Sequence, residues 1–252
     1  MKEVAIKGVT IGDGTVKICI PLSGADEKGL LCDIEYVRGK PCDLIEWRAD
    51  FWDEACDKDR LTAMMKTIKR ELSDKVFLFT YRTQEEGGSG NPALSDYMEI
   101  CKYVIDSGLP DIIDVEYRKA KDFNFPILEE AHDHGIKVLT SYHRFDEPTP
   151  DLDTMIKILR EQQQFGADIA KLAVMAQNDM ESNRIIEASR EMYGKHAKIP
   201  FILIGMGQFG SVTRAIKPFH GSSVTFARGR EATAPGQLSI EDLLAERSHF
   251  DV

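Results

Sequence analysis

The sequence predicts an α/β fold, a (β/α)8 or TIM barrel with a short N-terminal β-hairpin before its first strand. Eight apolar runs of strand length recur along the chain, and their starts lie roughly 20 to 36 residues apart. Most segments between them have helical periodicity. The first run leads into Pro21-Leu22-Ser23-Gly24, not into the Gly-rich phosphate loop typical of an open, doubly wound sheet. Eight β/α units in 252 residues therefore favour a closed barrel.

The start of the chain predicts the hairpin. Two short β segments, Val4–Ile6 and Val9–Ile11, are followed by the turn-rich Gly12-Asp13-Gly14. Short β segments separated by a tight turn pair with each other. We therefore expect a hairpin within residues 1–16, ahead of the main fold.

The predicted barrel strands alternate with predicted helices. The strands are Lys17–Leu22, Leu44–Asp50, Val76–Arg82, Ile112–Arg118, Lys137–His143, Ile169–Met175, Phe201–Met206 and Ser222–Ala227. Between them, apolar side chains recur at helical spacing over residues 61–72, 94–105 and 152–159. Ser239 and Asp242 form a capping box that opens the last helix. This alternation predicts a parallel sheet wrapped by helices.

Composition limits the classes of protein to consider. The chain is 42% hydrophobic and 29% charged, as in soluble globular proteins, and with no linker we expect a single domain over residues 1–252. The net charge of -10 disfavours nucleic acid and anionic membranes as partners, and no apolar run approaches a membrane span. Five cysteines without C-x-x-C spacing predict neither disulfides nor a zinc site. Because the start also lacks a secretory h-region, we expect a reduced, cytoplasmic protein.

Polar side chains gather at the C-terminal ends of the predicted strands, where a barrel of this kind carries its active site. The ends of the second to seventh runs contribute, in order, Glu46 and Arg48, Arg82 and Glu86, Asp114 and Glu116, His143, Lys171, and Met206. One charged strand end is common, but six in succession indicate a shared site. This set holds no plausible metal-ligand shell, so we expect neither a metal nor a cofactor.

Lys171 lies in the middle of the apolar run Ile169–Met175. Burying an ammonium is costly unless the charge is paired or used. One interpretation is that Lys171 pairs with a carboxylate or reaches solvent. The other is an amine held in a dry pocket, where its pKa falls and it attacks a carbonyl.

His143 ends the preceding strand, and its pKa range suits a general acid/base. An imine on Lys171 would acidify the adjacent C–H, and His143 could take that proton and return one to a leaving hydroxyl. A carboxylate on the other ring nitrogen would fix the tautomer of His143, and Glu86 is the first candidate.

Three arginines offer an anion site that the negative net charge does not provide: Arg48, Arg82 and Arg214. For Arg48 the alternative is a salt bridge to Glu46 or Asp50. Both interpretations of Arg48 remain open at the level of sequence.

The chain resembles the type I, Schiff-base-forming 3-dehydroquinate dehydratases along essentially its whole length. The motifs that carry the resemblance are Leu44–Asp50, Phe79–Arg82 with Glu86-Gly87-Gly88, Ile113–Glu116, Ser141-Tyr142-His143, Ala167–Met175 and Ala234-Pro235-Gly236-Gln237. The resemblance implies a lyase that dehydrates 3-dehydroquinate to 3-dehydroshikimate, the third step of the shikimate pathway, by syn elimination through a lysine imine. It also implies a homodimer.

Residue by residue, the resemblance implies the following roles. Lys171 forms the imine, His143 is the general acid/base and Glu86 orients it. The substrate-binding residues are then Glu46, Arg48 and Arg82 for the hydroxyls, Arg214 with Gln237 for the carboxylate, Met206 against the ring, and Thr233, which stands where the family commonly has Ser. Residues 228–237 resemble a mobile lid loop that excludes water.

Three further positions depart from the family pattern: Gln208 replaces a common Lys, Arg144 a usual Asp and Ala176 a usual Pro. They affect local charge and loop stiffness, and through them affinity. Two other functions are weighed against the dehydratase. One is another imine-forming barrel, an aldolase or transaldolase, for which Gly205-Met206-Gly207 and Gly221-Ser222 form a weak phosphate cradle. The other is a non-catalytic barrel that binds a carboxylate.

Overall fold

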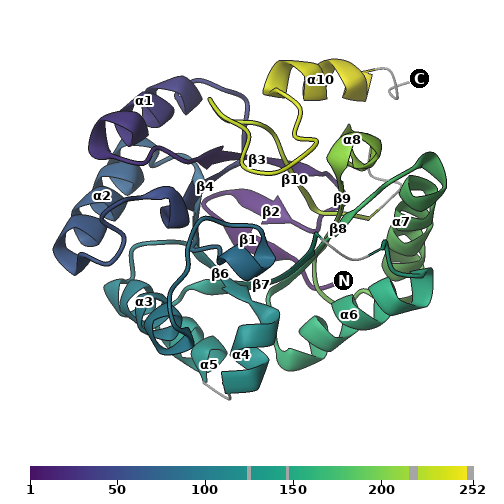
Figure 1. Cartoon of the computed structure of the whole chain (residues 1–252), viewed down its shortest axis with the longest axis horizontal. Helices are drawn as coiled ribbons and strands as arrows, with labels where there is room; N and C mark the ends of the chain where they lie inside the picture. The colour runs from purple at the N-terminus through teal and green to yellow at the C-terminus, as the bar shows by residue number, and fades with distance from the viewer. Residues whose placement is uncertain (124–125, 146–147, 216–220, 249–252) are drawn as a thin grey trace.

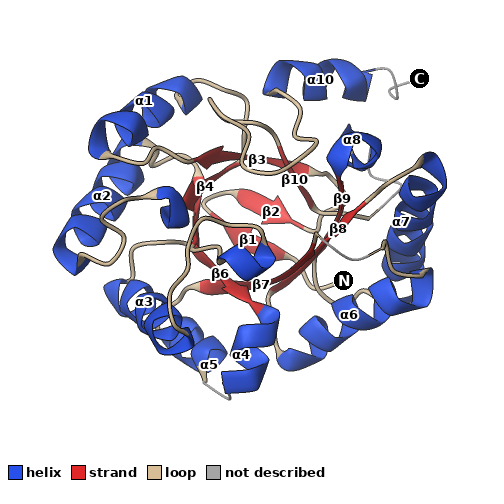
Figure 2. Cartoon of the chain, in the orientation of Figure 1, coloured by secondary structure: helices blue, strands red, loops and turns tan. Residues whose placement is uncertain are grey.

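The computed structural model describes residues 1–123, 126–145, 148–215 and 221–248. Its centre is a ring of parallel strands surrounded by helices (Figures 1 and 2). The strands are β3 (Lys17–Leu22), β4 (Leu44–Arg48), β5 (Val76–Thr80), β6 (Ile112–Glu116), β7 (Lys137–Arg144), β8 (Ile169–Met175), β9 (Phe201–Met206) and β10 (Val224–Phe226). Their order is β10-β3-β4-β5-β6-β7-β8-β9, and every neighbouring pair is parallel.

The ring is nearly closed. At the seam between β9 and β10, the bridge between Phe201 and Ser222 joins the two ends of the sheet in the described part of the chain. The predicted TIM barrel is confirmed.

Several strands differ in extent from the prediction, and the differences fall at the carboxyl ends of the strands or at the seam. The second strand ends at Arg48 because Ala49–Phe51 turns into a 3-10 helix, η1, and the third ends at Thr80. The fourth ends at Glu116, where α4 begins, and the eighth shrinks to Val224–Phe226. The apolar pattern continues past the ladder because buried residues also line the barrel mouth. The fifth strand runs one residue longer, to Arg144.

The helices cover the outside of the barrel. They are α1 (Glu27–Val37), α2 (Lys58–Glu71), α3 (Leu94–Ser107), α4 (Tyr117–Phe123), α5 (Ile127–Asp133), α6 (Leu152–Phe165), α7 (Asp179–Glu191), α8 (Gly207–Gly210), α9 (Val212–Ala215) and α10 (Ile240–Ser248), with η2 (Gln84–Glu86) and the π-helical η3 (Met192–His196). The predicted apolar stripes of α2, α3 and α6 are largely buried. Asp26, Asp57, Asp151 and Asn178 cap helices by accepting backbone N–H bonds, and the Ser239–Asp242 capping box is confirmed.

The predicted hairpin closes the amino end of the barrel. Its strands β1 (Val4–Ile6) and β2 (Val9–Ile11) pair antiparallel, and they lie inside the ring of strands in the view of Figure 1. Val4 and Ile11 pack into the apolar cluster that fills the barrel. Nζ of Lys7 lies 2.7 Å from Asp111, just before β6, and so ties the hairpin to the strand starts.

The amino end also carries three aspartates in a repeating position. Asp43, Asp111 and Asp168 immediately precede β4, β6 and β8, and each accepts the backbone N–H of the second residue of the preceding strand. The N···O distances are 2.8, 2.8 and 2.9 Å. These bonds satisfy donors that the parallel ladder leaves unpaired at its edge.

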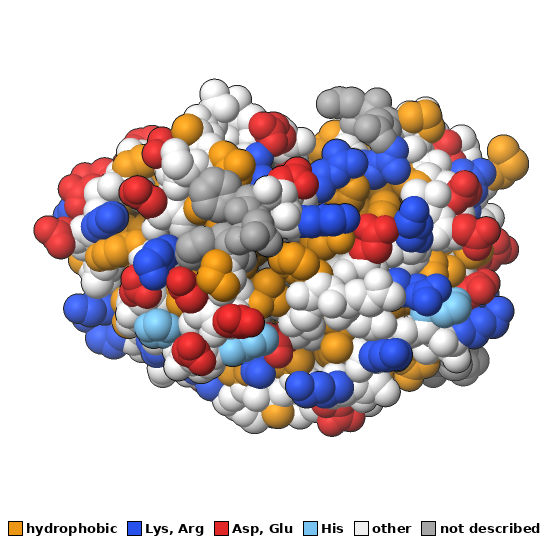
Figure 3. All heavy atoms as spheres, turned by 90° about the horizontal axis from the view of Figure 1, so that it is seen from below, with side chains coloured by type: hydrophobic (Ala, Val, Ile, Leu, Met, Phe, Trp, Pro, Cys, Tyr) orange, Lys and Arg blue, Asp and Glu red, His pale blue; other side chains and the backbone are white. Residues whose placement is uncertain are grey.

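The outer surface is charged and mixed. On the face shown in Figure 3, acidic and basic side chains are interspersed among neutral ones. None of the described helices is long and apolar enough to span a membrane.

Candidate active site

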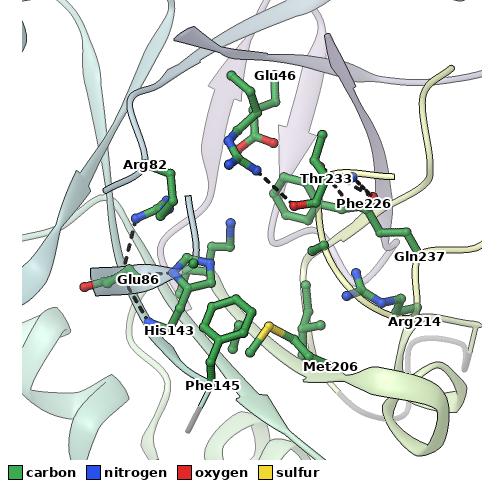
Figure 4. A pocket seen from close by; sticks show the side chains of 16 residues that line it. Glu46, Arg82, Glu86, His143, Phe145, Met206, Arg214, Phe226, Thr233 and Gln237 are labelled. Atoms are coloured by element: carbon green, nitrogen blue, oxygen red, sulfur yellow. Dashed lines mark hydrogen bonds and ion pairs between the residues drawn. The ribbon is translucent and has the colours of Figure 1, made fainter. Parts of the chain in front are cut away.

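A pocket opens at the carboxyl ends of the strands, and Figure 4 shows the side chains that line it. The ten residues that the resemblance assigns to the site all line this pocket: Glu46, Arg48, Arg82, Glu86, His143, Lys171, Met206, Arg214, Thr233 and Gln237. The other two carboxylates predicted at the strand ends, Asp114 and Glu116, are absent from its lining. They come from several strands, two short helices and the segment after β10. The topology therefore brings together residues from the second strand of the barrel to the segment after the last one.

Lys171 projects into the pocket from the middle of β8, with its side chain 7% exposed. Its Nζ lies 4.2 Å from the centre of the Phe226 ring and 3.9 Å from Oδ2 of Asp114. Burial lowers the pKa of Lys171, although the carboxylates of Glu46 and Asp114 oppose that shift. The environment favours the neutral, nucleophilic form of the amine more than water does.

His143 is held by Glu86. Oε2 of Glu86 accepts hydrogen bonds from Nδ1 of His143, at 2.9 Å, and from its backbone N–H, at 3.0 Å. With Nδ1–H assigned to this bond, Nε2 is the basic nitrogen of the ring. Burial, followed by the positive charges of Arg82 and Lys171, lowers the pKa of His143 well below 6.5.

The pKa of Glu86 moves the opposite way. Burial raises it to about 8, with further increases from Glu116 and Asp114, while Arg82 acts against the shift. The His143–Glu86 pair is thus a buried unit of low charge in which Nε2 of the neutral imidazole can accept a proton.

Phe145 and Gly87 complete the surroundings of His143, and neither was predicted as a site residue. The Phe145 ring stacks on the imidazole with a centroid distance of 6.4 Å and an interplanar angle of 20°. Gly87 has a φ of +78°, and a Cβ there would collide with the Phe145 ring. Glycine is therefore required for the ring to lie beside Glu86 and His143.

Arg82 is surrounded by carboxylates. Its Nη2 donates to Asp114 at 2.6 Å, and its Nη1 donates to Ser141 at 2.7 Å and approaches Glu86 and Glu116, each at 3.4 Å. Burial acts against its charge, but these carboxylates outweigh burial and raise its pKa well above the ordinary value of an arginine. Arg82 is a fixed cation, and much of its hydrogen-bonding capacity is used inside the protein.

Arg48 forms an ion pair with Asp50, which was one of the two interpretations left open by the sequence. Its Nε and Nη2 donate to the two oxygens of Asp50 at 2.8 and 2.7 Å. Its Nη1 donates to the backbone oxygen of Thr233 at 3.3 Å, so it also lines the pocket. Glu46 makes a different contact: its Oε1 accepts a hydrogen bond from Oγ1 of Thr80 at 2.9 Å.

Arg214, on α9, is a buried arginine with an unused hydrogen-bond donor. Its Nη2 donates to the backbone oxygen of Pro235 at 3.2 Å, and its buried Nε lacks a hydrogen-bond partner among the described residues. Burial lowers its pKa to about 10. A buried donor without an acceptor is a good binding point for an anionic ligand.

Residues 228–237 form an irregular segment over the pocket, visible as the yellow loop in Figure 1. Oε1 of Gln237 accepts the backbone N–H of Thr233 at 2.8 Å, and both side chains face the pocket on the side opposite Arg82 and Glu86 (Figure 4). Gly236, at φ +77°, packs against the backbone of Gly207 so closely that a side chain would not fit. The segment is thus fastened to the start of α8.

The three other departures from the family pattern, Arg144, Ala176 and Gln208, are absent from the pocket lining. Ala176 is buried, with its N–H bonded to the oxygen of Met206. Within the described ranges, no cluster of His, Cys, Asp or Glu could hold a metal ion.

Comparisons with known proteins agree with this geometry. The model of the type I 3-dehydroquinase family matches residues 18–246. A 3-dehydroquinate dehydratase of Alkaliphilus oremlandii is 37% identical over 96% of this chain and 94% of its own length. The enzyme of that name from Bacillus subtilis is 36% identical over 100% of this chain and 97% of its own length. The crystal structure of type I 3-dehydroquinate dehydratase from Clostridium difficile with covalently modified comenic acid superposes with a TM-score of 0.93, at 30% identity, over 99% and 97% of the two chains.

Proposed function

Since the chain belongs to the type I 3-dehydroquinase family and dehydrates 3-dehydroquinate in the shikimate pathway, we propose that it does so through a covalent imine on Lys171. The observation that carries this proposal is a buried amine whose pKa is lowered, in one pocket with the His143–Glu86 pair. Family membership favours dehydration over the aldolase, transaldolase and non-catalytic alternatives.

The first half of the reaction makes the electron sink. The neutral Nζ of Lys171 attacks the substrate ketone at C3, and the resulting carbinolamine takes up one proton on its hydroxyl and loses water to give a protonated imine. The imine carbon draws electron density from C2, so the adjacent C–H becomes acidic. Burial supports this step because it increases the fraction of Lys171 that carries a free electron pair.

In the second half of the reaction, His143 first accepts a proton from the substrate and then donates a proton to the leaving group. Nε2 of His143 takes the C2 proton, and the electron pair forms an enamine. That pair then forms the C1–C2 double bond as the C1 hydroxyl leaves, protonated by His143, so the elimination is syn. Hydrolysis of the conjugated imine releases 3-dehydroshikimate and regenerates Lys171. Glu86 orients the ring through Nδ1 and stabilises the imidazolium while it exists.

We assign substrate recognition to the remaining pocket residues. Arg214, with its buried Nε, binds the substrate carboxylate together with Gln237 and Thr233 on the opposite side of the pocket from His143. The ring hydroxyls then face the charged side chains of Glu46, Arg48 and Arg82, and Met206 packs against the ring.

We also propose that residues 228–237 act as a lid. The contacts of Thr233 with Arg48 and Gln237 support a closed position over the pocket. Closure would exclude water from the imine and prevent its premature hydrolysis. Family resemblance supports two further proposals, a homodimer and a cytoplasmic location, and light scattering of the purified protein tests the first.

Reductive trapping tests the covalent mechanism. Incubation with 3-dehydroquinate and borohydride should add the reduced ligand's mass to the peptide that contains Lys171, with matching loss of activity. The control variant Lys171→Met keeps an unbranched side chain one atom shorter, without the amine, and should acquire no mass. An unmodified wild-type protein, or an adduct on another lysine, would contradict the proposal.

A further inference from the structure

Asp114 lies behind the pocket wall, next to the amine that forms the imine. It is on β6, with a side chain 1% exposed, and it is absent from the pocket lining. Its Oδ2 lies 3.9 Å from Nζ of Lys171 and accepts from Nη2 of Arg82 at 2.6 Å. Its Oδ1 accepts from Ser141 Oγ at 2.5 Å. The roles assigned to the pocket residues leave this carboxylate unexplained.

The barrel register explains how Asp114 reaches Lys171 across an intervening strand. Ser141 on β7 pairs with Lys171 on β8, and β6 is the other neighbour of β7. The small side chain of Ser141 leaves room for Asp114, and its hydroxyl fixes the carboxylate in place. Arg82 fixes the other oxygen, so Asp114 is held from two directions.

We propose that Asp114 is a positioning residue for the reaction, one whose carboxylate fixes the Lys171 amino group and stabilises the positive charge of the protonated imine. This inference rests on the proposed imine mechanism. At 3.9 Å, Asp114 attracts the charge without a short hydrogen bond to Nζ, so the nitrogen stays free to attack a carbonyl. Asp114 touches Lys171, not the substrate.

Other charged and titratable groups also act on Lys171, and they differ from Asp114 in where they lie. Glu46 from β4 raises the pKa of Lys171 more than Asp114 does, but it lines the pocket and meets the substrate. Arg82 lowers that pKa, and the buried Cys19 of β3 raises it. His143 of β7 shares the pocket, and the Phe226 ring of β10 faces Nζ on another side. Because Asp114 lies outside the pocket lining, substrate entry leaves its contact with Lys171 in place.

The proposal predicts effects of opposite sign on two steps. Without the carboxylate, the pKa of Lys171 falls further, so the free amine is available at lower pH and imine formation extends to more acidic solutions. Without it, the protonated imine is also less stable, so elimination becomes slower. A purely structural role would damage both steps together.

The experiment compares the wild type with Asp114→Asn, which keeps the size of the side chain and removes its charge. Single-turnover reactions from about pH 5 to 10, quenched with borohydride, report imine formation, and steady-state kcat reports elimination. We expect the rising limb of the plot of imine-formation rate against pH to move about one pH unit lower in the variant. We also expect kcat to fall about tenfold, the equivalent of one pKa unit.

Ser141→Ala is the matched control, because it removes a hydrogen bond of Asp114 and keeps the charge. Its rising limb should stay within a few tenths of a pH unit of the wild type. The amide of Asp114→Asn could repel Arg82 and unfold that variant. In that case Asp114→Ser is measured instead, because it also removes the charge and its smaller side chain leaves room for a water molecule.

The outcomes separate this inference from the mechanism beneath it. A wild-type protein that traps no adduct on Lys171 overturns the imine mechanism and this inference with it. A wild-type protein that traps the adduct, combined with an unshifted limb in a folded Asp114 variant, overturns the role of Asp114 alone. That role is also overturned if both steps slow equally and in proportion to a lower Tm.

Discussion

The two ends of the barrel both carry buried or half-buried carboxylates, but they use them differently. At the amino end, Asp43, Asp111 and Asp168 each accept a backbone N–H at a strand start. At the carboxyl end, Glu86, Asp114 and Glu116 crowd around one arginine. Backbone donors are fixed dipoles, whereas Glu86 at the mouth is paired with His143, a side chain that can gain or lose a proton.

The pKa directions at the two ends reflect this difference. Burial acts to raise the pKa of Asp168, but the N–H of Val138 and the side chains of His132 and Lys137 outweigh it, and the pKa lies below 3.8. For Glu86, burial prevails over the attraction of Arg82 and the pKa rises to about 8. Ionised Asp168 therefore stabilises the fold, whereas Glu86 sits in an environment suited to proton transfer.

The largest expected effect is at the mouth. His143→Ala should lower kcat by about 10²- to 10⁴-fold, since it removes the general acid/base. Borohydride should still trap the imine on Lys171, because that step uses the amine. The unfolding transition in urea serves as the control and should stay close to that of the wild type. Near-normal turnover would remove His143 from the mechanism and weaken the contrast between the two ends.

Arg214→Ala should act on binding more than on chemistry. A charged hydrogen bond contributes about 1.5–3 kcal/mol, so KM should rise roughly 10- to 150-fold with a smaller change in kcat. Steady-state kinetics over a wide range of 3-dehydroquinate concentration measure both constants. Arg190→Ala, at an exposed position of α7, removes the same charge far from the pocket and should change neither. An equal loss in kcat would place Arg214 in the chemical step instead.

A substitution at the amino end should give the opposite pattern. Asp111→Ala leaves the N–H of Phe77 without the Asp111 acceptor and removes the ion pair of Lys7, which keeps its hydrogen bond to the backbone oxygen of Lys75. We expect the free energy of unfolding to fall by about 1–3 kcal/mol and kcat and KM to stay unchanged. Urea denaturation and kinetics on the same preparation test both halves, with the exposed Asp133→Ala on α5 as the control. A loss of activity in the folded variant would show that the two ends are coupled.

The smallest expected effect concerns acid stability. Because the pKa of Asp168 in the folded protein lies below 3.8, its ionised form contributes stability above that pH. That contribution is lost as the pH falls through the folded-state value. Asp168→Asn should therefore show a shallower loss of stability below pH 3.8 than the wild type, as followed by circular dichroism during acid titration. Parallel curves would mean that the contacts of Asp168 add nothing to its ionised form.

The sequence predicted the alternation of strands and helices, the hairpin and the set of residues that meet at the mouth. It did so because apolar periodicity reports which segments are buried, and the barrel topology then brings strand ends together. It missed Gly87, Phe145 and Phe226. An aromatic residue beside a strand looks the same in sequence whether it packs in the core or faces a ligand. Strand ends were misplaced for the same reason, since the mouth is also buried.

The sequence by itself determined that a lysine stands in a buried strand of a barrel, with an imidazole at the end of the strand before it. The tertiary structure decided what surrounds each charge. Arg48 is paired with Asp50, and Arg82 is surrounded by three carboxylates. Arg214 keeps a buried Nε that has no hydrogen-bond partner among the described residues. The physical reason is that pKa and binding capacity depend on distances across the barrel. Periodicity along one strand fixes the face a side chain occupies, but not which charge from another strand lies beside it.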